Sequence, residues 1–413
     1  MNIKNRITHK RLTVSLLLTL LFTSLAMAGD PQVALNTLLK SSSLTSSKTA
    51  ILIYDLATGE TIIEHNVSTP IVPASVMKCV SAAALTSKMP YNYRFETKIY
   101  TTGNISNGTL NGNIVVVGSG DPSLNTFRGA GEPDIVKEIV DALKENGINR
   151  VEGKIIVDNS YIAGPAVPEF WAAGDQNAYY GTGYHAFNFE GNANGKSAVR
   201  RPDEVFISKL KQAMSKQGIA LGDQTLADSS RKLLATHQSQ ILENIMRSCI
   251  FRSDNMYAES FLRLFGKASG TNGATVESAQ AAMDYWTRGQ YPMEAVNIVD
   301  GSGLSRNNRL TADFLGEVLG RHSDDAVYVS LFPLTGEEGT VKNFTKGTPL
   351  AAYMALKTGS MNGIQSYAGF KLNERYEPTH VVVVMSNDLK NRDKFRADLT
   401  KFFLEIFENQ PNN

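Results

Sequence analysis

The chain has 413 residues, of which 42% are hydrophobic and 20% are charged, with 33 glycines and 14 prolines. These fractions are typical of globular proteins and exclude disordered, collagen-like and fibrous classes. The formal charge is +1, but the first 28 residues hold four cations and no acid, so the rest of the chain carries −3. A slightly acidic body lacks the clustered Lys and Arg that bind a phosphate backbone, and we expect no nucleic-acid partner.

The N-terminus has the pattern of an exported precursor. A basic stretch from Lys4 to Arg11 precedes an apolar run over 12–25 and the small residues Ala26 to Ala28. This order predicts a signal peptide cleaved after Ala28 and delivery to the periplasm. The run is shorter than the roughly 20 residues that span a bilayer, although an uncleaved anchor stays open. We expect no integral membrane span after cleavage.

The N-terminal part of the mature chain predicts a hairpin followed by a buried helix. Residues 50–54 and 61–63 are strand-like and flank a turn. Residues 75–85 are mostly apolar and Ala-rich, which predicts a buried helix. Ser75 and Lys78 are polar exceptions near its start and need a functional reason.

The middle of the chain predicts α/β structure. Strands are expected at 113–117 and 151–157, and amphipathic helices at 134–146 and 203–217, each stopped by a glycine. We interpret residues 97–238 as an inserted accessory lobe.

The C-terminal part predicts a helical stretch and then a sheet. The chain is helical from about 240 to 265. Strands at 351–358, 364–371 and 379–385 follow, and a helix at 391–408 closes the chain. The charges of this last helix are balanced, so its apolar side is expected to pack on the sheet rather than on a membrane.

Two cysteines, Cys79 and Cys249, leave a disulfide and two buried thiols equally open. The sequence has no CxxC, no HExxH and no clustered His and Cys. It therefore predicts neither a metal site nor another cofactor.

The pattern Ser-x-x-Lys occurs at 75–78, 208–211 and 229–232, and context separates the three. The last two lie in polar, charged segments, where a solvated face explains them. Only Ser75 and Lys78 lie in an apolar helix, where the i,i+3 spacing stacks them on one face. Burial there would lower the pKa of Lys78 toward that of a usable general base.

Three short motifs then follow one another along the chain: Ser75-x-x-Lys78, Ser253-Asp254-Asn255 and Lys357-Thr358-Gly359. This ordered set resembles that of the penicillin-recognising serine enzymes. Further stretches resemble the D-Ala-D-Ala carboxypeptidase/endopeptidase family of low-molecular-mass penicillin-binding proteins, in its DacB-like, class C branch. They lie at 73–78, 118–124, 300–306 and 336–340.

The resemblance implies an α/β fold class, with a serine transpeptidase/β-lactamase-like domain and an inserted α/β lobe. The domain, an antiparallel sheet flanked by helices, would comprise 29–96 and 239–413, and the lobe 97–238. Ser253 follows Ser75 by 178 positions. Family members usually carry a longer insertion with two lobes, so we expect one lobe to be reduced or missing.

The resemblance also implies a covalent mechanism. Ser75 would attack the carbonyl between two D-alanines and form an acyl-enzyme, while Lys78 takes its proton. Ser253 would relay a proton to the leaving D-alanine, and Asn255 would hold Lys78 and the substrate amide. Peptidoglycan stem peptides are the implied substrates, and β-lactam antibiotics would acylate the same serine.

By the same resemblance, the third motif would bind the substrate. Lys357 and Thr358 would take the terminal carboxylate, and Gly359 would let the substrate lie along the strand. The backbone N–H groups of Ser75 and Ser360 would form the oxyanion hole. Water releases the acyl group, so no cofactor is implied.

A further pair of candidates would read the substrate side chain. Arg306 closes a turn rich in small residues, and Asp158 follows a predicted strand of the lobe. Facing each other across the cleft, they would suit the zwitterionic end of a diaminopimelate side chain. A surface Arg and a turn-capping Asp are the alternative explanation.

Two other function classes stay open. A serine β-lactamase shares the motif set, but the sequence shows no Glu-x-x-x-Asn loop between Ser253 and Lys357 to activate a deacylating water. A catalytically inactive peptidoglycan-binding protein would keep only the fold, which the intact motif residues argue against.

Overall fold

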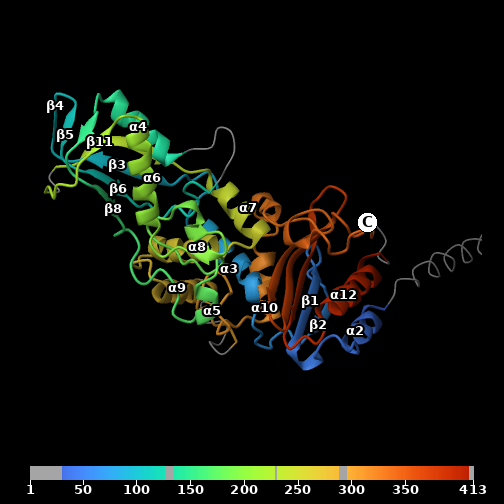
Figure 1. Cartoon of the computed structure of the whole chain (residues 1–413). Coiled ribbons are helices and arrows are strands. Elements are labelled where there is room, and N and C mark those ends of the chain that lie inside the picture. Colours follow the sequence, from blue (N-terminus) through green and yellow to red (C-terminus); the bar gives the residue numbers. More distant parts are fainter. Residues whose placement is uncertain (1–29, 127–133, 228–229, 288–294, 409–413) are drawn as a thin grey trace, which may run out of the picture.

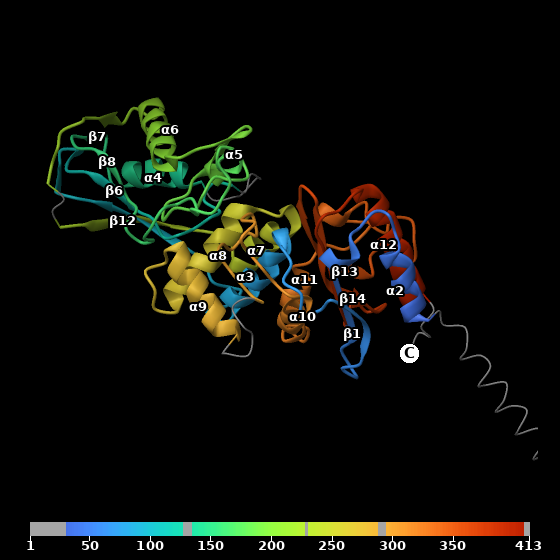
Figure 2. The ribbon, with the colours of Figure 1, turned by 90° about the horizontal axis from the view of Figure 1, so that it is seen from below.

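The structure, a computed structural model, describes residues 30–126, 134–227, 230–287 and 295–408. The predicted signal peptide at 1–28 lies outside these residues. The molecule is elongated, with a sheet-containing body at one end and a smaller lobe at the other (Figure 1). Figure 2 shows the same two parts from below.

The body is built on a five-stranded antiparallel sheet that joins both ends of the chain. Its strand order is β13-β14-β15-β1-β2. The strands are β1 (Thr49–Asp55), β2 (Thr61–His65), β13 (Met354–Met361), β14 (Ile364–Leu372) and β15 (Pro378–Ser386). In the register, Ile51 of β1 lies opposite Val384 of β15 and His65 of β2. The predicted hairpin and the three C-terminal strands are confirmed, with β13 starting three residues late.

Helices cover both faces of this sheet, so alternate residues of β1 enter different cores. Ile51 and Ile53 pack with the N- and C-terminal helices, whereas Ala50 and Leu52 pack with the central helices. Figure 1 shows α12 and α2 on one side of the sheet and α10 and α3 on the other. The helices of the body are α2 (Pro31–Leu39), α3 (Met77–Thr86), α7 (Leu242–Arg252), α8 (Asn255–Ala268), α9 (Thr275–Thr287), α10 (Ala312–Gly320), α11 (Ala326–Ser330) and α12 (Arg392–Phe407). The predicted closing helix therefore packs on the sheet.

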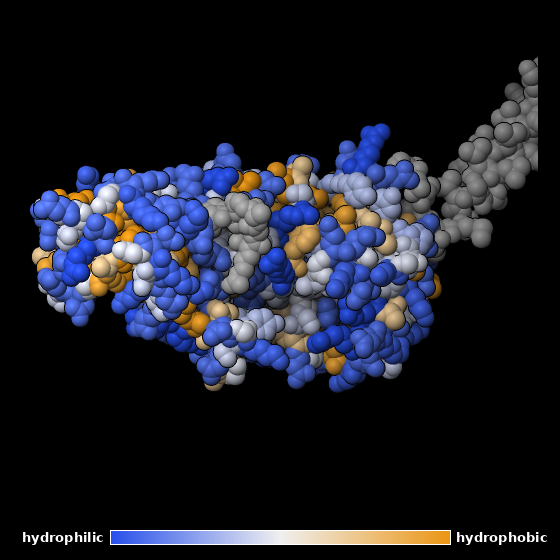
Figure 3. Space-filling view, turned by 45° about the horizontal axis from the view of Figure 1, so that its top comes forward, coloured by the Kyte–Doolittle hydropathy of each residue, from blue (hydrophilic) through white to orange (hydrophobic). Residues whose placement is uncertain are grey.

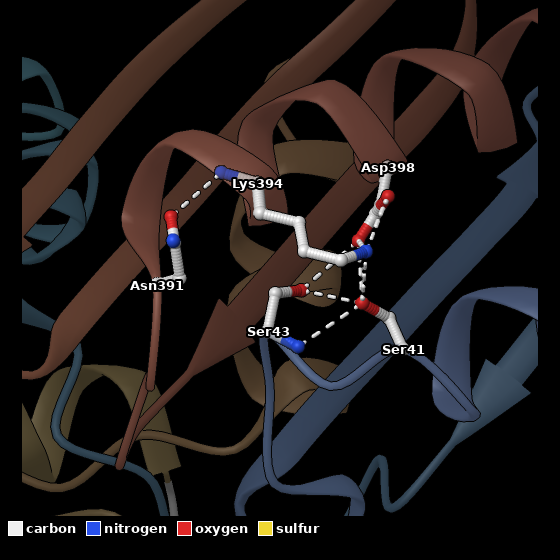
Figure 4. A network of polar contacts seen from close by, with 5 residues as sticks. All are labelled: Ser41, Ser43, Asn391, Lys394 and Asp398. Atoms are coloured by element: carbon white, nitrogen blue, oxygen red, sulfur yellow. Dashed lines mark hydrogen bonds and ion pairs between the residues drawn. The ribbon is translucent and has the colours of Figure 1, made fainter.

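A polar network ties the start of the described chain to α12 (Figure 4). Asp398 accepts hydrogen bonds from Ser41 and Ser43 and forms an ion pair of 2.8 Å with Lys394. Asn391 caps the helix by accepting from the backbone N–H of Lys394. The bonds to Asp398 join the segment that follows α2 to α12.

The lobe contains two four-stranded sheets, with orders β12-β3-β6-β8 and β11-β7-β5-β4. The strands are β3 (Glu96–Thr101), β4 (Asn104–Ser106), β5 (Thr109–Asn111), β6 (Ile114–Val117), β7 (Arg150–Val151), β8 (Ile155–Asp158), β11 (Ala220–Leu221) and β12 (Lys232–Gln238). Helices α4 (Ile135–Glu145) and α6 (Pro202–Lys216) pack on them in one hydrophobic core. Asp134 caps α4 by accepting from the N–H groups of Val136 and Lys137.

The single strand expected at 151–157 is wrong, because the chain there forms β7 in one sheet and β8 in the other. Gly153 lies between them, and a Cβ at this position would come within 2.4 Å of the Gly112 carbonyl oxygen. The apolar sequence pattern typical of a strand continues through both β7 and β8. The close approach of Gly153 to the Gly112 backbone divides the two strands.

Part of the segment predicted as a lobe packs into the body. Ile162, Tyr184 and Ala186 belong to the same core as α3 and α8. The division at 97 and 238 stays a prediction, and the stretch after β8 bridges the two parts.

Hydrophilic residues dominate the face shown in Figure 3, and apolar residues appear there only in scattered patches. Among the residues that the structure describes, no helix has the length and hydropathy needed to cross a bilayer.

Candidate active site

Ser75 lies in a tight helical turn at the start of α3. The 3₁₀ turn Ala74–Val76 leads directly into α3, and Ala74 adopts a left-handed φ of 51°. Lys78 follows one turn later and is fully buried. The predicted buried helix is therefore present, with both polar exceptions at its N-terminal end.

Lys78 makes three short hydrogen bonds through its Nζ atom. Its partners are Ser75 Oγ at 2.9 Å, Asn255 Oδ1 at 2.7 Å and the Ser302 carbonyl oxygen at 2.7 Å. Burial lowers the pKa of Lys78, and the surrounding acidic groups oppose that shift. A lysine that loses its proton more easily than usual therefore contacts the hydroxyl of Ser75, as general-base chemistry requires.

The second motif occupies a break between two helices. Ser253 ends α7 in a left-handed conformation, with φ 59° and ψ 41°, and Asp254 caps α8 by accepting from the Tyr257 N–H. A non-glycine residue rarely adopts this backbone conformation, and such strain often accompanies functional sites. The break directs the Ser253 hydroxyl toward Lys357, whose Nζ lies 2.9 Å away.

The third motif lies on β13 beside the Ser75 turn. Lys357 is fully buried, and burial, together with the charge of Lys78, lowers its pKa to about 7. Thr358 donates to Thr340 Oγ1 at 2.7 Å, and Ser360 is exposed. A Cβ at Gly359 would come within 2.6 Å of the Pro73 carbonyl oxygen. Glycine is therefore required for β13 to pack against the turn, a reason that the sequence did not reveal.

Two buried carboxylates next to Lys78 were missed by the sequence analysis. Glu259 of α8 and Asp300 are both fully buried. Glu259 accepts from the N–H groups of Gly301 and Ser302 at 3.1 and 2.9 Å. Burial and the neighbouring Asp300 raise the pKa of Glu259, and the N–H groups of Gly301 and Ser302 oppose that shift. Glu259 interrupts an apolar helix just as Lys78 does, and the same argument would have found it.

The chain that follows β8 also contributes to the site. The Trp171 indole donates to Asp300 at 2.9 Å, and the Tyr180 carbonyl accepts from Asn255 Nδ2 at 2.9 Å. Arg263, one turn after Glu259 on α8, donates to several backbone carbonyls, including that of Pro165 at 3.0 Å. The inserted chain is thus bonded to Asp300 and Asn255, two of the residues that surround Lys78.

Arg306 and Asp158 lie apart from this cluster and have other partners. Arg306 is exposed and donates to the carbonyl of Asn362, in the turn after β13, at 2.8 Å. Asp158 pairs with Arg231 at 3.4 Å and accepts from the Ser160 N–H at 3.0 Å. No contact between the two is present, and their joint role stays a prediction.

The remaining candidates behave as expected from their context. Ser208 and Lys211 are exposed on α6, and Lys232 lies in β12, while its partner Ser229 is outside the described residues. Cys79 and Cys249 are free, buried thiols rather than a disulfide. Within the described ranges, no three His, Cys, Asp or Glu side chains are grouped to hold a metal ion.

The sheet, the helix α3 behind it and the three converging motifs define a serine transpeptidase/β-lactamase-like hydrolase. The predicted fold class is confirmed by penicillin-binding protein 4 (dacB) from Haemophilus influenzae. That crystal structure has a TM-score of 0.76 at 20% identity and covers 91% of this chain and 98% of its own. A Bdellovibrio bacteriovorus peptidoglycan endopeptidase, Bd3459, has a TM-score of 0.55 at 14% identity, covering 88% and 92%.

The chain belongs to the D-Ala-D-Ala carboxypeptidase 3 (S13) family, whose model matches residues 32–195 and 190–402. It is similar to D-alanyl-D-alanine carboxypeptidase DacB of Haemophilus influenzae, at 24% identity over 84% of this chain and 87% of that protein. Carboxypeptidase DacB of Mycolicibacterium smegmatis is 27% identical over 77% and 72%. The predicted family is confirmed, and the protein is a serine-type D-Ala-D-Ala carboxypeptidase.

Proposed function

We propose that this enzyme cleaves peptidoglycan stem peptides through an acyl-enzyme formed on Ser75. The observation that carries the proposal is the pair of 2.9 Å contacts, one between Lys78 and Ser75 and the other between Lys357 and Ser253. Neutral Lys78 removes the Ser75 proton as Oγ attacks the carbonyl carbon of the scissile D-Ala-D-Ala bond. The N–H groups of Ser75 and Ser360 stabilise the oxyanion.

The tetrahedral intermediate then collapses as the C–N bond breaks. A proton reaches the departing D-alanine nitrogen through Ser253, which Lys357 holds within hydrogen-bond distance. Lys357 and Thr358 bind the carboxylate of that D-alanine, while Asn255 orients the substrate amide and Lys78. Water hydrolyses the ester and returns Ser75 to its hydroxyl form.

β-Lactams would acylate the same serine and remain attached, because their ring-opened product does not depart. Two structural relatives support this part of the proposal: the Haemophilus protein in complex with a β-lactam, and penicillin G-acylated Bd3459. The proposal also includes the cleaved signal peptide and a periplasmic location, which suit an enzyme whose substrate lies in the cell wall.

Mass spectrometry after treatment with penicillin tests the nucleophile. The adduct is expected on the peptide that contains Ser75. Ser208, which has the same spacing to a lysine but lies exposed on α6, is the internal control. An adduct on the peptide with Ser208, or none on the peptide with Ser75, would contradict the assignment.

The products distinguish the two peptidase activities and the alternatives. Digestion of purified muropeptides should release D-alanine from pentapeptides. Loss of crosslinked dimers in the same digest would show that the enzyme also has endopeptidase activity. A β-lactamase would instead turn over penicillin rapidly without touching muropeptides, and an inactive binding protein would do neither.

A further inference from the structure

The turn 300–305 lies between α8 and the Ser75 turn and fits only because of its glycines. A Cβ at Gly301 would come within 2.3 Å of the Ala258 carbonyl oxygen. At Gly303, which has a φ of 79°, a Cβ would come within 1.9 Å of the Ala74 carbonyl oxygen. The turn is therefore wedged between the helix that carries Asn255 and the turn that carries Ser75.

Every backbone hydrogen-bonding group of Gly301 and Ser302 has a partner. Glu259 accepts from both N–H groups, at 3.1 and 2.9 Å. Ser81 Oγ donates to the Gly301 carbonyl, and Lys78 donates to the Ser302 carbonyl, both at 2.7 Å. The peptide that presents its oxygen to Lys78 consequently has a fixed orientation.

Asp300 fixes the rest of the same turn. Its carboxylate accepts from the N–H groups of Gly303 and Ser305 at 2.7 and 2.6 Å, and from Trp171 and Asn308 at 2.9 and 2.8 Å. Both carboxylates are fully buried, so these hydrogen bonds satisfy groups that water cannot reach.

The hydrogen bond to the Ser302 carbonyl determines how the neutral amine of Lys78 is oriented. A neutral amine has two N–H groups and one lone pair. Asn255 Oδ1 and the Ser302 carbonyl can only accept, so they take both N–H groups. The lone pair is then left for the third partner, the Ser75 hydroxyl, which can donate.

We propose that Glu259 and Asp300 are positioning residues that hold the Ser302 carbonyl on Lys78 and thereby direct its lone pair at Ser75. This inference rests on the proposed function, in which neutral Lys78 takes the Ser75 proton. After transfer, the ammonium donates three hydrogen bonds to the same three partners, so nothing needs to move during the step. Without the Ser302 carbonyl, the amine could rotate and present an N–H to Ser75.

Acylation kinetics with a fluorescent penicillin test the proposal in the full-length mature protein. Glu259→Gln keeps the size but offers only one oxygen for two N–H groups, and Glu259→Ala offers none. The acylation rate should fall by about tenfold in the first and by up to about a hundredfold in the second, because small misplacements of a reacting group are this costly. Asp55→Asn is the matched control, since Asp55 also accepts two backbone N–H groups but in the β1–β2 turn.

The pH profile separates positioning from a merely structural effect. Asp300 and Glu259 both raise the pKa of Lys78 against its burial. Asp300→Asn should therefore lower the plateau rate and also move the acid limb of the profile to lower pH. Four other groups that face Lys78 stay in place in the variant: Lys357 of β13, Cys249 of α7, Asp254 before α8, and Cys79 beside Lys78. Glu259 ionises more readily without Asp300, which reduces the size of the shift but not its direction.

Each outcome decides one of the two proposals. If wild type is not acylated on Ser75, the proposed function fails. If wild type is acylated there but folded Glu259→Gln and Asp300→Asn react at the wild-type plateau rate, the positioning inference fails. Should those variants not fold, Glu259→Asp keeps the charge but draws both oxygens back from the N–H groups of Gly301 and Ser302. A folded Glu259→Asp that reacts at the wild-type plateau rate would overturn the inference.

Discussion

The charged residues around Ser75 in the body differ in burial from four ion pairs of the lobe. In the body, Lys78 and Lys357 are fully buried, as are the carboxylates of Glu259 and Asp300. In the lobe, the ion pairs lie at the surface: Lys137 with Asp141, Arg150 with Glu152, Lys209 with Glu190 and Arg231 with Asp158. Burying a charge costs several kcal/mol, whereas an exposed pair contributes about 0–1 kcal/mol.

This difference indicates where the reactivity lies. A lysine whose pKa is lowered by burial is a weaker base than a free lysine, but more of it is in the neutral form that can accept a proton at neutral pH. None of the four surface pairs of the lobe contains a buried lysine. The chain after β8 instead contributes to the site through the Trp171 indole and the Tyr180 carbonyl. Changes to the buried charges around Ser75 should therefore have large effects, and changes to the surface pairs of the lobe should have small ones.

The largest effect is expected for Ser75→Ala. This change removes the nucleophile, and release of D-alanine from a pentapeptide should fall by more than about a thousandfold. A D-alanine assay with the purified protein measures the loss. Ser208→Ala, the same change on the exposed face of α6, should keep wild-type activity. Substantial release by the Ser75 variant would contradict the covalent mechanism.

Lys78→Ala should reduce acylation by about a hundred- to ten-thousandfold, the usual contribution of a general base. The fold should remain nearly intact, because the loss of a costly buried charge offsets the loss of its hydrogen bonds. Stopped-flow acylation and thermal unfolding measure the two properties, with exposed Lys211→Ala as control. A variant that acylates near the wild-type rate would show that another group is the base.

Lys357→Gln should reduce activity on peptides with a free C-terminal carboxylate by about 10- to 100-fold, because glutamine can still donate a hydrogen bond but lacks the positive charge. Burial lowers the pKa of Lys357 to about 7, so the free enzyme loses this cation as the pH rises above that value. The KM for such peptides should therefore increase above about pH 7 in wild type and stay flat in the variant. Equal activity on carboxylate and amidated C-termini would refute this role.

The sequence predicted the elements of the body more completely than the contacts among them. Ser75, Lys78, Ser253 and Lys357 belong to short motifs whose spacing and apolar context are visible in one chain. Partners such as the Ser302 carbonyl are backbone groups, which carry no side-chain signal.

Other parts depended on long-range packing. The β7 and β8 strands share one apolar pattern, and only the approach of Gly153 to Gly112 divides them. Trp171 reaches Asp300 across 129 positions, and no local pattern indicates that contact. No local pattern indicates that Arg231 pairs with Asp158 in the lobe.

A small effect is expected for Arg306→Ala, at the edge of the body. Arg306 is exposed and bonds the Asn362 carbonyl in the turn after β13, the strand that carries the third motif. We propose that its guanidinium also binds the distal carboxylate of a diaminopimelate side chain. The exposed contact should be worth about a two- to fivefold change in kcat/KM. The measurement compares peptides that carry diaminopimelate with otherwise identical peptides that carry Lys.

Lysine has the amine of diaminopimelate but lacks its distal carboxylate, so only the diaminopimelate peptide should lose rate in the variant. Asp158→Ala extends the comparison to the lobe, where a slower reaction with both peptides would place Asp158 on the shared amine. Its existing pair with Arg231 makes a negligible change the expected result. If Arg306→Ala slows both peptides equally, Arg306 supports the turn after β13 and does not read the substrate side chain.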